Sequence, residues 1–338
     1  MIDVLVAGGG PTGLAAAINA ALAGMEVVVV EPRPTPVDKA CGEGLMPAGV
    51  AALRALGVEV TGRPLRGIRY LDARRQAEAP FRHGPGLGVR RTGLHAALAE
   101  RAAEVGVKIV RGRVEGVRQH PGWVEAAGMR ARWLVAADGL HSPLRRALGL
   151  ELPPGRAPRR YGLRRHFNVA PWTDFVEVHW AARGEAYVTP VADDLVGVAV
   201  LSRERRGYDE HLAEFPALLD RLRGPSATSV RGGGPLRQRA RARVAGRVLL
   251  AGDAAGYVDA LTGEGVSLGL LSARALIGCL RAGRPEAYEG AWRRLSLRHR
   301  LLTGALLAAR RHPLPAGLIV PAAHRLPAVF TAAVNALA

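Results

Sequence analysis

The sequence predicts an α/β fold in which an antiparallel sheet is inserted into a parallel one and C-terminal helices follow. Continuous apolar runs, typical of buried parallel strands, lie at residues 2–7, 132–137 and 247–251. Shorter alternating runs, which indicate an antiparallel sheet, lie between them at 163–169, 175–180, 186–191 and 195–201. From residue 287 the pattern is helical, and prolines interrupt it from residue 313 onward.

The first strand leads into a glycine-rich loop and an apolar helix at residues 14–23. The loop contains G-x-G-x-x-G at Gly8, Gly10 and Gly13, with Pro11 and Thr12 inside it. In a Rossmann-type domain the first glycine permits a tight turn and the second lets the backbone approach a pyrophosphate. The third glycine lets helix and strand pack closely. The helix N-terminus offers free N–H groups to phosphates.

A second apolar run, residues 25–30, ends on Glu31, 18 residues beyond Gly13. A carboxylate at this place can accept hydrogen bonds from a ribose hydroxyl. Because strand, loop, helix, second strand and acid follow in this order, the sequence predicts a dinucleotide site.

The same patterns place the remaining elements. Helices are expected at residues 47–56, 89–105, 208–223 and 266–280. Strands are expected at residues 107–110, 114–117 and 123–126, with weaker strand character between 65 and 80.

Composition limits the class of protein. The 338 residues are 49% hydrophobic, enough for a sizeable core, and carry a formal charge of +18. All basic residues except Lys39 and Lys108 are arginine, and they are scattered rather than clustered on a module, so no nucleic-acid partner is expected. Attraction to anionic cofactors, acidic substrates or a membrane surface fits the charge better.

Cysteine usage and hydropathy narrow the class further. With Cys41 and Cys279 as the two cysteines, neither a disulfide scaffold nor a cysteine-rich metal site is expected. No charged leader and no apolar run of membrane-spanning length is visible. A reducing cytoplasm is therefore the expected compartment.

Three motifs, in their order along the chain, resemble the flavoprotein hydroxylase superfamily typified by p-hydroxybenzoate hydroxylase. The first is the Gly8–Gly13 fingerprint with Glu31. The second, residues 137–145 (ADGLHSPLR), is similar to the family's DG motif, and the third, residues 249–256 (LLAGDAAG), to its GD motif. The resemblance implies non-covalently bound FAD, with NAD(P)H as a transient electron donor.

The resemblance also implies which residues contact the cofactor. Asp253, after Gly252, would accept hydrogen bonds from the ribityl hydroxyls. The loop from Thr262 through Gly263, Glu264 and Gly265 to Val266 would present backbone N–H groups to the flavin. The other cofactor-binding candidates are Arg33, Arg91, Asp138 and Gly139. Asp138 with Ser142 could instead cap a helix.

Residues 41–45 (CGEGL) and 262–265 (TGEG) look most like the geranylgeranyl-reductase-like branch of this superfamily. That branch usually has proline ahead of the second loop, where this chain has Ala260. Cys41 is the catalytic candidate, beside the flavin. The alternative is that Cys41 is a small buried hydrophobe.

The resemblance implies a discontinuous FAD-binding domain of residues 1–64, 85–155 and 235–285. Residues 65–84 and 156–234 would form a β-sheet substrate-binding domain, and 286–338 a helical tail. The expected activity is an NAD(P)H-dependent monooxygenase acting on a hydrophobic aromatic, polyketide or lipid-like molecule. The alternatives are a geranylgeranyl-reductase-like ene reductase and a non-catalytic flavin-binding protein. A halogenase is disfavoured because its W-x-W-x-I-P signature is absent.

The arginine runs, two histidines and the C-terminal tail can each be interpreted as structural or as functional. Solvated faces are expected for Arg156, Arg159, Arg160, Arg164 and Arg165, and for a strand carrying Arg237, Arg239, Arg241 and Arg243. His166 and His179 are expected to be structural, with substrate binding as the alternative. The tail is expected to close over the nucleotide-binding domain. Its alternative is to line an apolar pocket, with Arg310, Arg311 and Arg325 in peripheral contact with a membrane.

Overall fold

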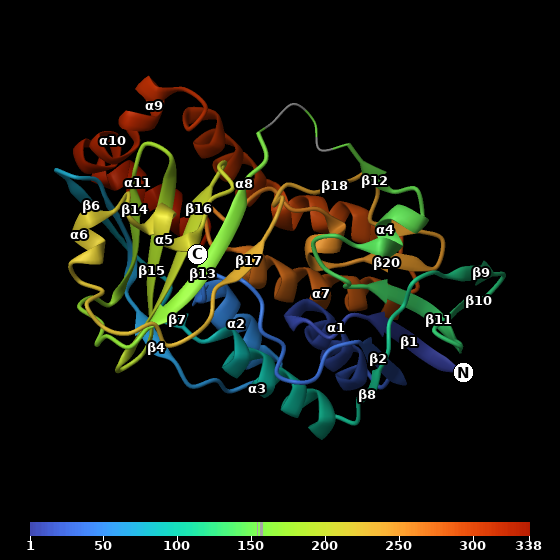
Figure 1. Cartoon of the computed structure of the whole chain (residues 1–338). Coiled ribbons are helices and arrows are strands. Elements are labelled where there is room, and N and C mark those ends of the chain that lie inside the picture. Colours follow the sequence, from blue (N-terminus) through green and yellow to red (C-terminus); the bar gives the residue numbers. More distant parts are fainter. Residues whose placement is uncertain (154, 156–157) are drawn as a thin grey trace.

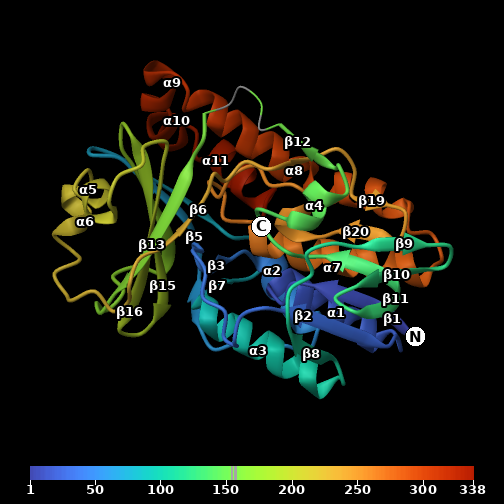
Figure 2. The same cartoon turned by 45° about the vertical axis from the view of Figure 1, so that its right-hand side comes forward.

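The computed structural model describes residues 1–153, 155 and 158–338. Two large sheets stand side by side, and helices cover the first of them and lie against one edge and one face of the second (Figures 1 and 2). The predicted α/β architecture with an inserted sheet is confirmed. Arg156 lies outside the described residues.

The first sheet is built around parallel strands in the order β20-β11-β1-β2-β8. Those strands are β1 (Ile2–Ala7), β2 (Val27–Glu31), β8 (Lys108–Arg111), β11 (Met129–Ala136) and β20 (Val248–Leu250). Antiparallel additions are β9 (Arg118–His120), β10 (Trp123–Ala126) and β19 (Val244–Ala245). The central strands are almost wholly apolar because helices cover the sheet, and β1 is buried from Val4 to Ala7.

Several helices belong to the part of the molecule built on this first sheet. They are α1 (Pro11–Leu22), α2 (Pro47–Ala55), α3 (Arg91–Glu104), α4 (Pro143–Ala147) and α7 (Gly265–Arg281). Helices α1 and α7 approach closely because Gly269 carries no side chain. A Cβ there would lie 2.3 Å from Thr12 Oγ1.

The second sheet has the order β17-β13-β16-β15-β14-β5-β6. Its strands are β5 (Gly67–Leu71), β6 (Gln76–Pro80), β13 (Tyr161–Phe167), β14 (Phe175–Trp180), β15 (Gly184–Ala192), β16 (Leu195–Ser202) and β17 (Arg231–Gly233). Neighbours run antiparallel except for β14 and β5, which are parallel. The sheet is therefore mixed at one pairing. The domain boundaries stay a prediction.

Small elements join the two halves. A three-stranded sheet contains β3 (Gly44–Leu45), β4 (Arg63–Leu65) and β7 (Gly86–Gly88), and β12 (Glu151–Leu152) pairs with β18 (Arg239–Ala240). A 3-10 turn, η1 (Gly252–Ala255), follows β20.

Three expected elements differ from the structure. Residues 114–117 form no strand, and the next strand begins at Arg118. The helix expected at 208–223 is divided into α5 (Tyr208–Leu212) and α6 (Pro216–Leu219), since Pro216 cannot donate to the preceding turn. The arginine-bearing strand expected at 237–243 is limited to β18.

The solvated interpretation of the arginine runs is wrong at three positions. Arg160, Arg164 and Arg243 are buried, and each pairs with a carboxylate: Arg160 with Glu185, Arg164 with Asp38, and Arg243 with Glu289. Partners distant in the sequence make this burial tolerable.

The tail consists of α8 (Ala287–Ala309), α9 (Pro313–Gly317), α10 (Ile319–Arg325) and α11 (Pro327–Asn335). Helix α8 packs on α7, in the nucleotide-binding half. Helices α10 and α11 pack instead against β6, at the edge of the second sheet (Figure 1). In the described residues, no helix combines the length and apolar character needed to cross a membrane.

Candidate flavin-binding site

The three motifs meet because the strands that carry them are neighbours. β1, β11 and β20 are parallel and adjacent, so their carboxyl ends lie at one edge of the sheet. The loop after β1 holds the glycine fingerprint, the loop after β11 holds Asp138, and η1 after β20 holds Asp253. Such an edge is where doubly wound sheets bind nucleotides.

A cavity of about 690 Å³ opens at this edge and extends toward the second sheet. The predicted site residues that line it are Gly8, Gly10, Pro11, Thr12, Glu31, Arg33, Cys41, Arg91, Asp138, Gly139, Gly252, Asp253, Thr262, Gly263, Gly265 and Val266. Gly13 and Glu264 do not line it.

The glycine loop has the geometry expected of a phosphate cradle. Gly8 has φ +99°, and a Cβ there would lie 2.5 Å from the Ala137 carbonyl oxygen. A Cβ on Gly13 would lie 1.9 Å from the Gly8 carbonyl oxygen, so Gly13 serves helix–strand packing. Gly10 faces open space, with Arg91 Nη2 3.8 Å from the place of its missing Cβ. Pro11 begins α1, so the helix N-terminus faces this space.

Glu31 is held at the end of β2 by two neighbours. Its Oε2 accepts a hydrogen bond from Gly9 N at 2.8 Å, and its Oε1 accepts one from Arg33 Nε at 2.7 Å. Although burial opposes it, the hydrogen bonds from Arg33 and Gly9 lower the pKa of Glu31, which stays ionised. Arg33 therefore lies over the carboxylate that is predicted to receive the ribose.

One of the two carboxylate oxygens of Asp138 accepts a hydrogen bond from the protein. Its Oδ2 accepts from Leu144 N at 3.1 Å, while its buried Oδ1 has no partner among the described residues. Ser142 caps α4, accepting from Arg145 N at 2.9 Å. Asp138 and Ser142 thus both accept from N–H groups in the first turn of α4, as the capping interpretation expects, and one oxygen of Asp138 is left for a ligand.

Asp253 presents a free acceptor. In the described part of the chain no donor reaches its carboxylate, and burial raises the pKa of this carboxyl despite the nearby Lys39. Burial also lowers the pKa of Lys39, which lines the same cavity and was not singled out from the sequence. A hydroxyl-bearing ligand would satisfy Asp253.

Cys41 lines the cavity, and a network of buried polar contacts holds the loop that carries it. Cys41 Sγ accepts from Glu43 N at 3.4 Å, and burial raises the pKa of its thiol. Glu43 has φ +60°, and its Oε1 accepts from Arg91 N at 2.7 Å. Its Oε2 lies 2.5 Å from Nε2 of the buried His166.

Sequence reasoning missed the Glu43–His166 pair because 123 residues separate its members. His179 contacts Glu177 at 3.1 Å, and neither histidine lines the cavity. Both contacts fit the structural interpretation of the histidines.

The two polar side chains of the loop 262–266 make their hydrogen bonds with α8. Thr262 Oγ1 lies 2.9 Å from Thr303 Oγ1, and Glu264 Oε2 lies 2.9 Å from His299 Nδ1. Gly265 begins α7, so the backbone N–H groups of its first turn have no carbonyl partner within the helix.

Arg145 is a further residue that the sequence did not assign. It is fully buried, and its Nη1 donates to the Ala254 carbonyl at 3.1 Å while its Nη2 donates to the Leu140 carbonyl at 3.0 Å. It therefore ties the second motif to the third. Its place in the DGLHSPLR run was the available signal.

The residues present fit FAD. A glycine cradle lies at a helix N-terminus, and unsatisfied polar atoms of Asp138 and Arg91 are buried beside it. Asp253 and Glu31 supply carboxylates at neighbouring strand ends. Fold and site together define a flavoprotein of the FAD-dependent oxidoreductase class.

The chain belongs to the FAD binding domain family, whose profile matches residues 1–282. The predicted FAD cofactor and enzyme class are thereby confirmed.

Several curated relatives are reductases or monooxygenases. Menaquinone reductase of Mycolicibacterium smegmatis is 32% identical over 337 residues, covering 88% of this chain and 80% of the relative. Digeranylgeranylglycerophospholipid reductase 1 of Methanothermobacter thermautotrophicus is 29% identical over 299 residues, covering 80% and 74%. Rifampicin monooxygenase of Streptomyces venezuelae is 29% identical over 304 residues, covering 81% and 62%.

Solved structures share the fold. The flavin-dependent halogenase CmlS superposes with a TM-score of 0.79 at 21% identity, covering 91% of this chain and 64% of that one. A triple mutant of the flavin-dependent brominase Bmp2 gives a TM-score of 0.81 at 18% identity, covering 100% and 94%.

Proposed function

We propose that this FAD-dependent oxidoreductase reduces carbon–carbon double bonds of a long-chain prenyl compound, either a prenyl quinone or a prenyl lipid. The proposal rests on the polarity of the cavity wall, which changes along the length of the cavity. Near the strand ends its wall is polar, but toward the second sheet it is apolar. The apolar part includes Leu65, Ile68, Val176, Val178, Leu201 and Val334. Such a wall favours a hydrocarbon chain.

The named relatives support this substrate class. Two of them carry reductase names with a menaquinone or a digeranylgeranyl lipid as the named compound. The resemblance of residues 41–45 and 262–265 to the reductase-like branch points the same way. We therefore place the reductase ahead of the hydroxylase that the sequence first favoured.

Alkene reduction requires a hydride and a proton. FAD, when bound and reduced by the electron donor, would supply the hydride. The proton must come from a group in the cavity, and we assign this role to the Cys41 thiol, which burial keeps protonated. The Glu43 N–H and the buried Glu43–His166 contact hold the loop that carries Cys41. NAD(P)H is the proposed electron donor.

An anaerobic turnover experiment tests the proposal. FAD-loaded protein is mixed with NADPH or NADH and with a menaquinone or a geranylgeranyl lipid. The masses of the products are then measured by mass spectrometry. Gain of two hydrogens per reduced double bond is expected. Flavin that bleaches with the donor but leaves every prenyl substrate unchanged would contradict the substrate class.

Hydroxylation is the second candidate, favoured by the relationship to rifampicin monooxygenase. The same mixture in air distinguishes it, because a hydroxylase adds one oxygen atom to the substrate. A protein that merely binds flavin would change neither the flavin nor the substrate under any of these conditions.

The outer face of the tail supports peripheral contact with an anionic membrane, from which a long-chain substrate would enter. Leu314, Leu318, Leu326 and Val329 on α9–α11 are 84%, 60%, 56% and 62% exposed. Exposed Arg311 and Arg325 flank them. Arg310 does not belong to this face, since it is buried against Glu185. The apolar side chains would enter the lipid boundary and the arginines would meet headgroups.

Flotation with anionic liposomes tests this contact. We expect binding at low salt that weakens at high salt and in the Leu314→Asp/Leu318→Asp variant. Absence of binding to anionic vesicles at low salt would refute it.

A further inference from the structure

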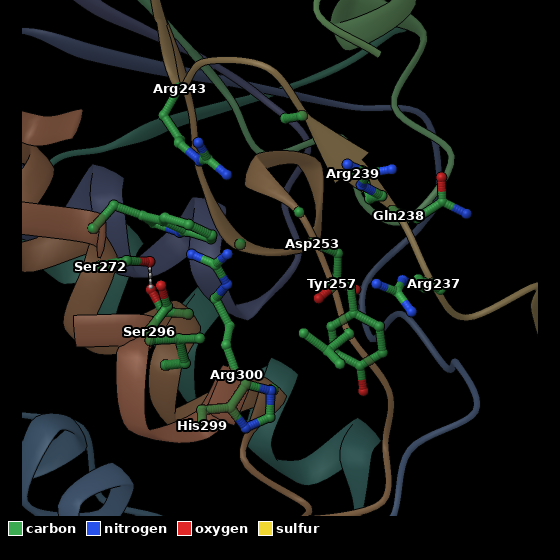
Figure 3. A pocket seen from close by; sticks show the side chains of 18 of the residues that line it. Arg237, Gln238, Arg239, Arg243, Asp253, Tyr257, Ser272, Ser296, His299 and Arg300 are labelled. Atoms are coloured by element: carbon green, nitrogen blue, oxygen red, sulfur yellow. Dashed lines mark hydrogen bonds between the residues drawn. The ribbon is translucent and has the colours of Figure 1, made fainter. Parts of the chain in front are cut away.

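A second cavity, of about 470 Å³, lies next to the flavin cavity. Figure 3 shows the side chains that line it. Its walls come from the segment 237–243, from η1 and from the helices α7 and α8. The two cavities share Gly252, Asp253, Tyr257 and Gly265 as a common wall. No part of the proposed activity uses the second cavity.

Arginine dominates its lining. Five arginines line it, and Asp253 is the single carboxylate among the described lining residues; the arginines are Arg237, Arg239, Arg243, Arg293 and Arg300. Figure 3 shows Arg237, Arg243 and Arg300 pointing into the space from two different walls. Guanidinium groups of like charge repel, and although Arg239, Arg293 and Arg300 are exposed to solvent, an anion in the cavity would relieve the remaining repulsion.

Protein carboxylates neutralise only part of this charge. Glu289 Oε1 lies 2.9 Å from Arg243 Nη1 and 3.1 Å from Arg293 Nε. In residues 1–153, 155 and 158–338, no carboxylate pairs with Arg237, Arg239 or Arg300. A surplus of positive charge therefore faces the cavity.

Trp292 organises two of these groups. The Arg243 guanidinium lies 3.9 Å from the centre of a Trp292 ring and that of Arg300 lies 5.8 Å away. Trp292 itself is buried. Cation–π contact of this kind holds a guanidinium in place while its N–H donors stay available.

We propose that this cavity binds an organic diphosphate. Planar guanidinium forks match phosphate oxygens in bidentate pairs, which selects phosphate chemistry. Arginines without a carboxylate partner stand on two different walls, which calls for more than one anionic group. The volume also far exceeds that of a single small ion, since a water takes about 30 Å³. A dinucleotide and a prenyl diphosphate both carry the required group.

The cavity is connected to the flavin loop through His299 on α8. His299 lines the cavity, and its Nδ1 lies 2.9 Å from Glu264 Oε2 and 3.1 Å from Thr262 Oγ1. The described hydrogen bonds of this ring use Nδ1, which leaves Nε2 for a ligand. An anion beside His299 would therefore change the field at the loop 262–266 and perturb the flavin absorption spectrum.

The test uses the FAD-loaded protein and inorganic pyrophosphate as the first probe. Calorimetry measures the affinity of pyrophosphate binding. Arg237→Gln and Arg300→Gln should each weaken pyrophosphate binding by about tenfold or more, because each removes a charge-assisted hydrogen bond. Arg298→Gln, an exposed arginine on the same helix, is the matched control and should change it less than twofold. Flavin content of each variant checks that the fold is intact.

Competition then identifies the source of the diphosphate. Displacement of pyrophosphate by NADPH assigns the cavity to the electron donor, and displacement by geranylgeranyl diphosphate assigns it to a substrate. In either case a shift of the flavin spectrum should accompany binding and be lost in Arg300→Gln. Lack of saturable pyrophosphate binding, equal binding by the arginine variants, or displacement by neither ester would overturn the proposal. None of these results depends on alkene reduction, so the two proposals fail separately.

Discussion

At the scale of single residues, Asp253 is the clearest case of an acceptor that is available to a ligand. Its carboxylate lines the cavity without a donor from the described protein, and burial raises its pKa. Because no donor of the described protein reaches this carboxylate, a hydroxyl of a bound ligand would supply the missing hydrogen bond.

Asp253→Ala should weaken FAD binding by about tenfold or more, since a hydrogen bond to a charged group contributes about 1.5–3 kcal/mol. Fluorescence titration of the apoprotein with FAD measures this. Asp193→Ala is the control, because that side chain is 96% exposed and should leave affinity unchanged. Equal FAD affinity in Asp253→Ala and the parent would remove Asp253 from the site.

The Cys41 thiol should react slowly. Burial raises its pKa, so the thiol is protonated at neutral pH, and the alkylation rate by iodoacetamide should climb only as the pH rises beyond the ordinary value of 9.0. FAD should protect Cys41, which lines the cavity, but not Cys279 on α7.

Peptide mass mapping after timed alkylation separates the two thiols, and Cys279→Ser isolates Cys41. Fast, FAD-independent labelling of Cys41 at neutral pH would show that it lies outside the flavin cavity. That result would remove Cys41 from the proposed role of proton donor.

At the scale of elements, α11 combines two faces with different tasks. Val334 is 7% exposed and lines the cavity, whereas Val329 on the same helix is 62% exposed. The helix packs on β6, so its inner face completes the apolar wall.

Val334→Asp should reduce turnover of a long-chain substrate at least tenfold while FAD affinity stays unchanged, because a charge would enter the hydrocarbon end of the cavity. Val329→Asp is the matched control and should keep solution activity. Kinetics with detergent-solubilised substrate and parallel FAD titrations measure both. Equal activity of the two variants would place the substrate elsewhere.

At the scale of the whole molecule, a buried charge network joins three segments that are distant in the sequence. Arg160, before β13, pairs with Glu185 on β15 at 2.6 Å and with Asp259 after η1 at 3.1 Å. Arg310, at the end of α8, pairs with the other oxygen of Glu185 at 2.6 Å. The network connects the inserted sheet, the cofactor segment and the tail.

Arg310→Ala should lower the free energy of unfolding by about 3 kcal/mol, because it leaves the buried Glu185 with one partner fewer. Its neighbour Arg311 is exposed, and Arg311→Ala should change stability by less than about 0.5 kcal/mol. Denaturant titrations of both variants give the comparison. If the two substitutions have equal effects, the network does not hold the tail in place.

The cofactor-binding half of this protein could be predicted from the amino-acid sequence. Gly8, Gly10 and Gly13 act through local backbone geometry, and the order of buried strands brings Asp138 and Asp253 to the same edge. These patterns depend on neighbours within a few residues, or on the topology of parallel sheets, and both can be inferred from the chain.

Other features of the protein became visible only in the folded structure. Arg160, Arg164 and Arg243 are buried because partners far along the chain neutralise them, and the Glu43–His166 contact spans 123 residues. The placement of α11 on β6 and the gathering of Arg237 and Arg300 around one cavity arise in the same way. Whether a charge is solvated or buried depends on long-range packing, which no local spacing encodes.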